Sequence, residues 1–357
     1  MNALVIHAPK DLRIESVEVP PPAEDEVLID IEVGGVCGSD LHYYNHGGFG
    51  TVKLKEPMIL GHEVSGRVKQ IGGDAIDHST DLAIGDLVAI SPSRPCFKCS
   101  YCHEGHHNHC ENMQFYGSAM PWPHIQGAFR QQLTVKNWQC VKANKITAAE
   151  AAMAEPFAVA LHATKLATNL SGDLLGKSVL VTGCGPIGIL SIVAARRSGA
   201  AQIVATDITD NALKFAEECG ADNTFNVATS AESLEPYTRG KGHFDVMYEC
   251  SGNAQALASG IAALRPKGVA MQLGLGGDMN LPMMQLTAKE ISLRGSFRFH
   301  SEFATAVELM SAGLVDVKPL ITHSIAFDNA VEAFDIANKR EEAMKTQILF
   351  QTEVKFQ

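Results

Sequence analysis

Four cysteines, Cys96, Cys99, Cys102 and Cys110, fall within fifteen residues at C-x2-C-x2-C-x7-C spacing. Such spacing lets short loops bring four thiolates to one tetrahedral ion, and a closed four-sulfur shell leaves no position for a substrate. We therefore predict a structural zinc. An iron–sulfur cluster is the competing interpretation, because four cysteines also hold those clusters. Disulfides are the alternative in an oxidising compartment.

A second set of metal-binding residue types is spread over two segments. Cys37 follows an apolar run that is typical of a strand, and His62 and Glu63 lie in the run Gly61–Gly66. Taken separately, Cys37 would be a small buried side chain and the His62–Glu63 pair a polar turn. If the two segments meet in space, these three residues could hold a second zinc that keeps one position open for a substrate.

Glu155 is a further candidate, because it stands among apolar residues in a segment, 147–168, that is predicted to be helical and bent or begun near Pro156. A carboxylate in such surroundings at a domain junction is unusual. A solvated helix residue or a buried ion pair would explain it equally well.

A nucleotide-binding turn is predicted between residues 178 and 207. A β-branched run at 179–182 precedes Gly183, Gly185 and Gly188, and a helical pattern follows them. In this context the first glycine permits the tight turn, the second lets the backbone approach a pyrophosphate, and the third lets helix and strand pack closely. The free N–H groups at the helix N-terminus favour phosphates.

Asp207 stands at the end of the next predicted strand, 19 residues after Gly188. Its carboxylate could accept hydrogen bonds from both ribose hydroxyls, and it would repel a 2′-phosphate. Arg196 and Arg197 belong to the preceding helix and provide no 2′-phosphate pocket. We therefore expect NAD, with NADP as the alternative.

The bulk composition limits the classes of protein. The chain has 357 residues, 46% hydrophobic and 19% charged, and a net charge of −11. We expect two domains and neither a nucleic-acid nor a membrane partner, since no basic run and no membrane-length apolar run is present. The start of the chain has no secretory pattern, and the clustered cysteines suit metal binding in a reducing, cytoplasmic setting.

The fold class predicted is α/β with two kinds of region. Residues 1–156 read as a β-rich catalytic domain, and residues 157–296 alternate strands and helices as a doubly wound parallel sheet does. Residues 297–357 are expected to return to the first domain, with a final strand near 345–351.

Together these motifs resemble the zinc-dependent medium-chain dehydrogenase/reductase family. The G-H-E-x-x-G run at 61–66, continued by Gly72, the four-cysteine lobe and the nucleotide turn occur in that family's order over essentially the whole chain. The resemblance implies a GroES-like domain, a Rossmann domain, two zinc ions per chain and a homodimer or homotetramer.

Within the family, the runs 37–43 and 154–156 are similar to the polyol dehydrogenase branch. In that branch the glutamate after the zinc histidine, here Glu63, ligates the metal directly, while the later glutamate, here Glu155, can act through water. We therefore predict Cys37, His62, Glu63 and Glu155 as the catalytic zinc set. Which glutamate ligates is left open.

The resemblance also carries expected roles for other residues. Ser39 is expected to take the substrate proton and His42 to pass it on, with Glu155 as the competing base. Pro186, Ile187, Ser251 and Leu273 are expected to line the cofactor site, and Tyr43 and Arg298 to face the substrate.

A finer match, at 115–120, 274–277 and 290–303, is to enzymes of this branch that act on a sugar acid. Arg298 could then bind the carboxylate with two hydrogen bonds, although it could also bind polyol hydroxyls, a cofactor phosphate or an acidic neighbour. The predicted function is hydride transfer between NAD(P) and a secondary hydroxyl of a sugar acid. A sorbitol- or xylitol-type polyol dehydrogenase is the alternative enzyme, and a zinc-stabilised dinucleotide sensor is the alternative without turnover.

Overall fold

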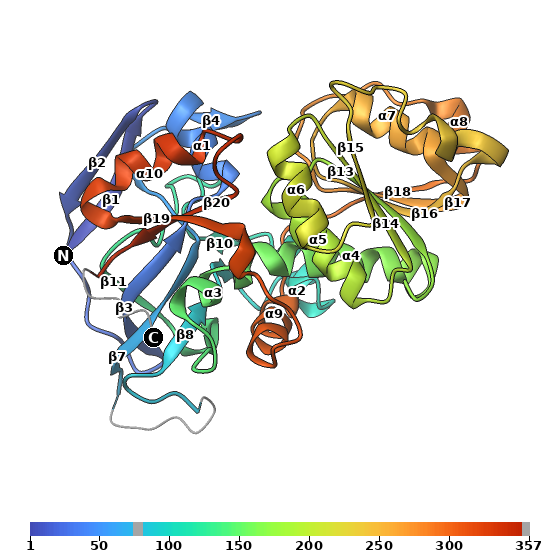
Figure 1. Cartoon of the computed structure of the whole chain (residues 1–357). Coiled ribbons are helices and arrows are strands. Elements are labelled where there is room, and N and C mark those ends of the chain that lie inside the picture. The colour runs from blue at the N-terminus through green and yellow to red at the C-terminus, as the bar shows by residue number, and fades with distance from the viewer. Residues whose placement is uncertain (74–80, 352–357) are drawn as a thin grey trace. The chain divides into compact units, whose positions relative to one another are not determined.

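The computed structural model describes residues 1–73 and 81–351, which fall into two units (Figure 1). The first unit holds Met1–Glu155, Phe303–Lys339 and the chain from Lys345, and the second holds Pro156–Glu302 and Arg340–Met344. Among the described residues, no helix is both long and apolar enough to cross a membrane.

The first unit is built on a mixed sheet with the strand order β12-β8-β7-β3-β20-β19, and β11 also pairs with β3. These strands are β3 (Glu26–Gly35), β7 (Glu63–Ile71), β8 (Leu87–Ile90), β11 (Gln132–Lys136), β12 (Cys140–Lys142), β19 (Ile321–Ala326) and β20 (Lys345–Leu349). β20 pairs antiparallel with β3. The strand expected near 345–351 therefore does join the sheet of the N-terminal region.

Shorter elements complete this unit. The strands are β1 (Asn2–Ala8), β2 (Asp11–Ser16), β4 (Gly48–Phe49), β5 (Val52–Lys53), β6 (Met58–Ile59), β9 (Ser93–Arg94) and β10 (Gln114–Phe115). The helices are α1 (Gly38–His46), α2 (Ser100–His103), α3 (Ala148–Ala152), α9 (Glu302–Ser311), which begins at the unit boundary, and α10 (Ala330–Ala337). Apolar residues of the sheet, such as Ile29, Ile31 and Val88, pack with Phe129 and Phe334 into one core.

The second unit is a parallel sheet with the strand order β15-β14-β13-β16-β17-β18. In chain order this is 3-2-1-4-5-6, the Rossmann arrangement, which confirms the predicted doubly wound sheet. The strands are β13 (Ser178–Thr182), β14 (Gln202–Asp207), β15 (Asn223–Asn226), β16 (Phe244–Glu249), β17 (Leu264–Gln272) and β18 (Ser292–Gly295). The helices are α4 (Ala154–Ser171), α5 (Pro186–Arg197), α6 (Asp210–Glu218), α7 (Ala254–Ala263) and α8 (Met283–Ala288).

The order of the strands explains the layers of the second unit. Right-handed crossovers that run outward in opposite directions from β13 and β16 place α5 and α6 on one face of the sheet and α7 on the other (Figure 1). From β13 the successive strands are added toward one edge of the sheet, and from β16 toward the other. The carboxyl ends of β13 and β16 therefore form the switch point at which such sheets bind ligands.

The helical segment predicted over 147–168 is two helices, because the chain breaks at Met153 between α3 and α4. Thr147 is the N-cap of α3 and forms a capping box with Glu150, whose backbone N–H donates to the Thr147 hydroxyl. Pro156 lies in the first turn of α4, where a missing N–H disrupts no helical hydrogen bond.

Candidate functional site

The four cysteines of the lobe come together. The sulfur atoms of Cys96, Cys99, Cys102 and Cys110 all lie within 4.8 Å of one another, and the Cys96 N–H donates to the Cys110 sulfur at 3.2 Å. A hydrogen bond from the Lys98 backbone, the largest cause, lowers the pKa of Cys96 to about 6. This all-thiolate set suits a closed, tetrahedral zinc site.

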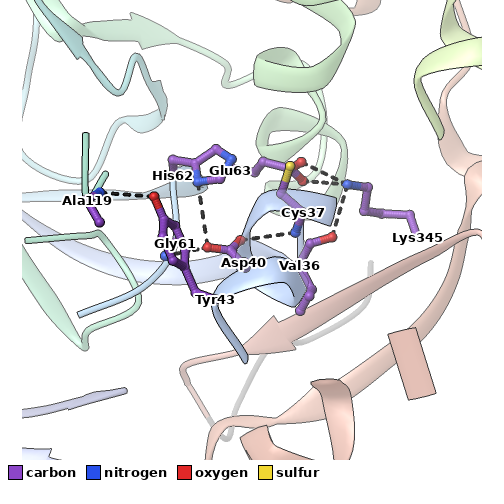
Figure 2. Close-up of polar contacts among 9 residues, drawn as sticks. All are labelled: Val36, Cys37, Asp40, Tyr43, Gly61, His62, Glu63, Ala119 and Lys345. Atoms are coloured by element: carbon purple, nitrogen blue, oxygen red, sulfur yellow. Dashed lines mark hydrogen bonds and ion pairs between the residues drawn. The ribbon is translucent and has the colours of Figure 1, made fainter. Parts of the chain in front are cut away.

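The second cluster joins residues that are distant in sequence. β3 pairs with β7 so that Gly35 lies opposite Glu63, and Cys37 follows two residues later as the N-cap of α1. The ligand atoms of Cys37, His62 and Glu63 therefore lie within 4.8 Å of one another (Figure 2). The sheet register thus brings together the three residues that the sequence predicted to meet.

Burial dominates the electrostatics of this cluster. Burial, reinforced by the Glu63 charge, raises the pKa of Cys37 to about 12. Burial also raises the pKa of Glu155 to about 8, against the lowering effect of His62. A bound divalent cation reverses such shifts because it stabilises the thiolate and the carboxylates. One sulfur, one imidazole and one carboxylate therefore fit a zinc ion that keeps an open position.

Asp40 supports this cluster from the first turn of α1 and was missed by the sequence reasoning. It is fully buried, and burial raises the pKa of its carboxyl group. One oxygen accepts from the Cys37 N–H at 3.1 Å and the other from the Gly61 N–H at 3.2 Å, and Asp40 Oδ1 lies 3.8 Å from His62 Nδ1 (Figure 2). At this distance the Asp40 carboxylate acts on His62 through its charge and not through a hydrogen bond. The signal available was its place three residues after Cys37.

Lys345 was also missed. Its Nζ lies 2.8 Å from each carboxylate oxygen of Glu63 and 3.3 Å from the Val36 carbonyl oxygen (Figure 2). Burial opposes its charge, but Glu63 and Cys37 together outweigh burial and raise the pKa of Lys345. No local signal pointed to it, because 282 residues separate it from Glu63.

The other residues predicted for this site lie around the cluster. Among the described residues, Glu155 is not one of the three whose ligand atoms gather within 4.8 Å, although it is buried at the start of α4. Ser39 is half-buried and His42 exposed, both on α1. Tyr43 is buried and its hydroxyl accepts from the Ala119 N–H at 3.0 Å. The roles of these four residues stay predictions.

The nucleotide turn has the backbone that its glycines predicted. Gly183 has φ +84°, and Gly185 is the N-cap of α5, with Pro186 in the first turn ahead of Ile187. A Cβ on Gly188 would lie 1.9 Å from the Gly183 carbonyl oxygen. The turn is therefore tight, and the helix begins against it with free N–H groups.

Asp207 ends β14 and is engaged by this turn. Its Oδ2 accepts from the Cys184 N–H at 2.7 Å, and its Oδ1 accepts from the N–H groups of Ile208 and Thr209 at 2.7 and 2.9 Å. The carboxylate thus holds the glycine turn and the start of the next loop together. Its second predicted role, toward a ribose, stays a prediction.

The loops after β16 and β17 share one buried carboxylate, that of Glu249. Its oxygens accept from the N–H groups of Ser251 and Gly252 and from the Gln272 side-chain amide. Its carbonyl oxygen accepts from the Leu273 N–H at 2.8 Å. Glu249, unnoticed in the sequence, therefore fixes both loops in which Ser251 and Leu273 were predicted to meet a cofactor.

Arg298, the predicted substrate residue, belongs to the second unit. It has φ +56°, and its guanidinium carbon lies 4.8 Å from the centre of the Phe297 ring. Its role toward a substrate stays a prediction.

Comparisons with known proteins agree with this geometry. Residues 23–145 match the family model of the alcohol dehydrogenase GroES-like domain, and residues 186–312 match the model of the zinc-binding dehydrogenase. The chain is 43% identical over 325 residues to L-idonate 5-dehydrogenase (NAD(P)(+)) of Escherichia coli strain K12, covering 90% of this chain and 91% of that one. It is 34% identical to sorbitol dehydrogenase of Bos taurus, covering 94% and 93%. The crystal structure of L-idonate 5-dehydrogenase from Escherichia coli K-12 superimposes with a TM-score of 0.90 at 39% identity, covering 98% of each chain.

Proposed function

This chain belongs to the zinc-binding, GroES-like alcohol dehydrogenase family, and from that premise we propose that it oxidises a secondary hydroxyl of a sugar acid, L-idonate to 5-keto-D-gluconate, with NAD(P). The observation that carries the proposal is the convergence of Cys37, His62 and Glu63 within 4.8 Å in a chain 43% identical to an L-idonate 5-dehydrogenase.

When bound, zinc would supply a Lewis acid for the substrate hydroxyl, and the nicotinamide would supply a hydride acceptor. Cys37, His62 and Glu63 would hold the metal, and Asp40 would position the backbone on either side of the site through the N–H groups of Cys37 and Gly61. Ser39 would accept the hydroxyl proton while it passes its own proton to His42, and the exposed His42 would release that proton to solvent. Glu155, acting through water, is the competing base.

On the cofactor side, the N–H groups at the start of α5 would bind the pyrophosphate. Asp207 favours NAD because its carboxylate repels a 2′-phosphate, although NADP stays possible. The loops fixed by Glu249 would pack against the nicotinamide half through Ser251 and Leu273. The cysteine lobe would hold the second, structural zinc.

The sugar-acid assignment rests on the higher of the two identities. Arg298 would recognise the carboxylate with its planar pair of N–H groups, and Tyr43 would border the same substrate. The 34% identity to sorbitol dehydrogenase supports a polyol as the second candidate. We further propose a cytoplasmic homodimer or homotetramer, as the family resemblance implies, without nucleic-acid or membrane partners. Light scattering on the purified protein tests the subunit number.

A substrate panel tests the function. L-Idonate, sorbitol, xylitol and threonine are offered with NAD or NADP, and 5-ketogluconate with the reduced cofactors. We expect the highest kcat/KM with L-idonate and NAD, and loss of turnover after metal removal. Faster oxidation of sorbitol or xylitol would replace the sugar-acid assignment with the polyol one. Turnover that survives complete metal removal would contradict the proposed mechanism.

A further inference from the structure

The contact between Glu63 and Lys345 is unusually complete for an ion pair. Each carboxylate oxygen lies 2.8 Å from the same Nζ, and the side chains are only 1% and 3% exposed. Lys345 donates a hydrogen bond to each oxygen of this carboxylate. A buried pair at this distance is strongly coupled, because water screens it little.

The surroundings of Glu63 leave its carboxylate little freedom. A Cβ on Gly35 would lie 2.2 Å from Glu63 Oε2, so the backbone of β3 closes one side. Lys345 closes another, and its own position is set by the pairing of β20 with β3 and by its hydrogen bond to the Val36 carbonyl oxygen. The ligand atoms of Cys37 and His62 lie within 4.8 Å of the same carboxylate (Figure 2).

A carboxylate can bind a metal through one oxygen or through both. If both oxygens bind, a site of three residues supplies four ligand atoms, and the metal has no open coordination position left for a substrate in tetrahedral geometry. A cation that remains attached to the carboxylate opposes that second contact, because it competes with the metal for the same oxygens. Lys345 is in a position to act in this way.

We propose that Lys345 is a positioning residue that restricts Glu63 to one metal-binding oxygen and so preserves the open position of the catalytic metal site. The inference rests on the proposed function, in that it takes Cys37, His62 and Glu63 as metal ligands. It differs from a purely structural ion pair, whose loss would lower stability and leave the coordination of the metal unchanged.

Cobalt(II) substitution reads the coordination directly. Four-coordinate Co(II) absorbs visible light more strongly than five- or six-coordinate Co(II), so a second oxygen contact weakens the band. The Cys37→Ala variant, which leaves the cysteine lobe intact, supplies the lobe spectrum that is subtracted from the others. Because this measurement needs no turnover, it is independent of substrate choice.

The decisive variant is Lys345→Met, which keeps the length of the side chain and removes its charge. We expect its catalytic-site band to fall at least about twofold, since the freed carboxylate adds an oxygen to the coordination. Lys345→Arg, which keeps a cation, should retain most of the band. Lys289→Met is the matched control, because Lys289 is a lysine of the second unit whose Nζ donates to the backbone carbonyls of Ile261, Ala262 and Leu264.

A double variant tests whether Lys345 acts through Glu63. In the Glu63→Gln background, Lys345→Met should cause no further spectral change, because the two substitutions affect one interaction. Unfolding of the metal-free proteins is measured in parallel, and Lys345→Met should be less stable than wild type because it leaves a buried carboxylate unpaired.

Each outcome bears on one proposal. A full-strength band in a folded, cobalt-loaded Lys345→Met variant would reduce Lys345 to a structural partner and overturn this inference, while the proposed function would stand. A wild-type spectrum identical to that of Cys37→Ala would show that no metal binds at Cys37, His62 and Glu63, and the proposed function would fail with it.

Discussion

The cysteine lobe and the Cys37–His62–Glu63 cluster are both groups of metal-binding side chains, but they are encoded in different ways. All four cysteines of the lobe lie within fifteen consecutive residues, 96–110, so local turns suffice to bring their sulfurs together. The other cluster depends on the pairing of β3 with β7 and on a lysine from β20. The comparison teaches that a site made by one loop can be stabilised by its metal alone, whereas a site made by a sheet takes its geometry from the fold.

The sharpest test of this contrast is Cys37→Ala. If the fold supplies the geometry of the catalytic cluster, the variant should stay folded with near-normal thermal stability. It should lose at least about 10³-fold in kcat/KM, since Lewis-acid stabilisation is worth several kcal/mol. Metal analysis should show zinc falling from about two to about one per chain. Unfolding of the variant would contradict the contrast.

Cys102→Ser tests the other member of the comparison, the cysteine lobe. Because the lobe depends on its metal, we expect a stability loss of at least about 2 kcal/mol, measured by denaturant unfolding, together with loss of one zinc. The catalytic cluster should keep its metal, and the kcat of the folded fraction should change by less than about threefold. A stable, singly loaded variant would show that the lobe does not need its zinc.

Asp207 extends the comparison to a locally encoded cofactor site. Asp207→Ser removes the charge that would oppose a 2′-phosphate, so the kcat/KM ratio of NADP to NAD should rise about tenfold or more. The control is Asp210→Asn, three residues further on, whose carboxylate accepts from the Asn226 side chain at 2.6 Å. Steady-state kinetics with both cofactors give the ratio, and an unchanged ratio would remove Asp207 from cofactor selection.

The smallest effect is expected at Glu302, which belongs to a charge cluster whose members are distant in sequence. Burial would raise the pKa of Glu302, but the contact with His162 and the hydrogen bonds from Lys165 and the His300 backbone N–H outweigh it and hold the pKa well below the ordinary 4.5. Lys165 Nζ lies 2.8 Å from its Oε1.

Because the folded pKa is depressed, the ionised Glu302 stabilises the protein above pH 4.5, and this contribution is lost as the pH falls toward the folded value. Glu302→Gln should therefore be less stable than wild type at pH 7 by about 1 kcal/mol or less. The difference should shrink toward about pH 3. Urea unfolding at several pH values measures it, and a constant difference would exclude the carboxylate charge as the cause.

The sequence predicted the sites made by neighbouring residues better than those made by segments that are distant in the chain. The cysteine spacing and the turn at Gly183–Gly188 are short-range patterns, and the parallel sheet followed from alternating strands and helices. Cys37, His62 and Glu63 could be named because each belongs to a recognisable run, although their meeting depends on the sheet register. Lys345 could not be found, because nothing near it in the chain reports on a carboxylate 282 residues away. The break at Met153 lies three residues before Pro156, near which the sequence predicted a bend or a helix start.

The position of Lys345 on β20 also sets an order of assembly during synthesis. The cysteine lobe is complete once residue 110 has left the ribosome, so its zinc can be captured while most of the chain is still unmade. Cys37, His62 and Glu63 are made even earlier, yet the cation that neutralises Glu63 follows that glutamate only after 282 further residues. Until β20 has been made, the nascent protein therefore carries an acidic centre whose charge Lys345 does not yet balance.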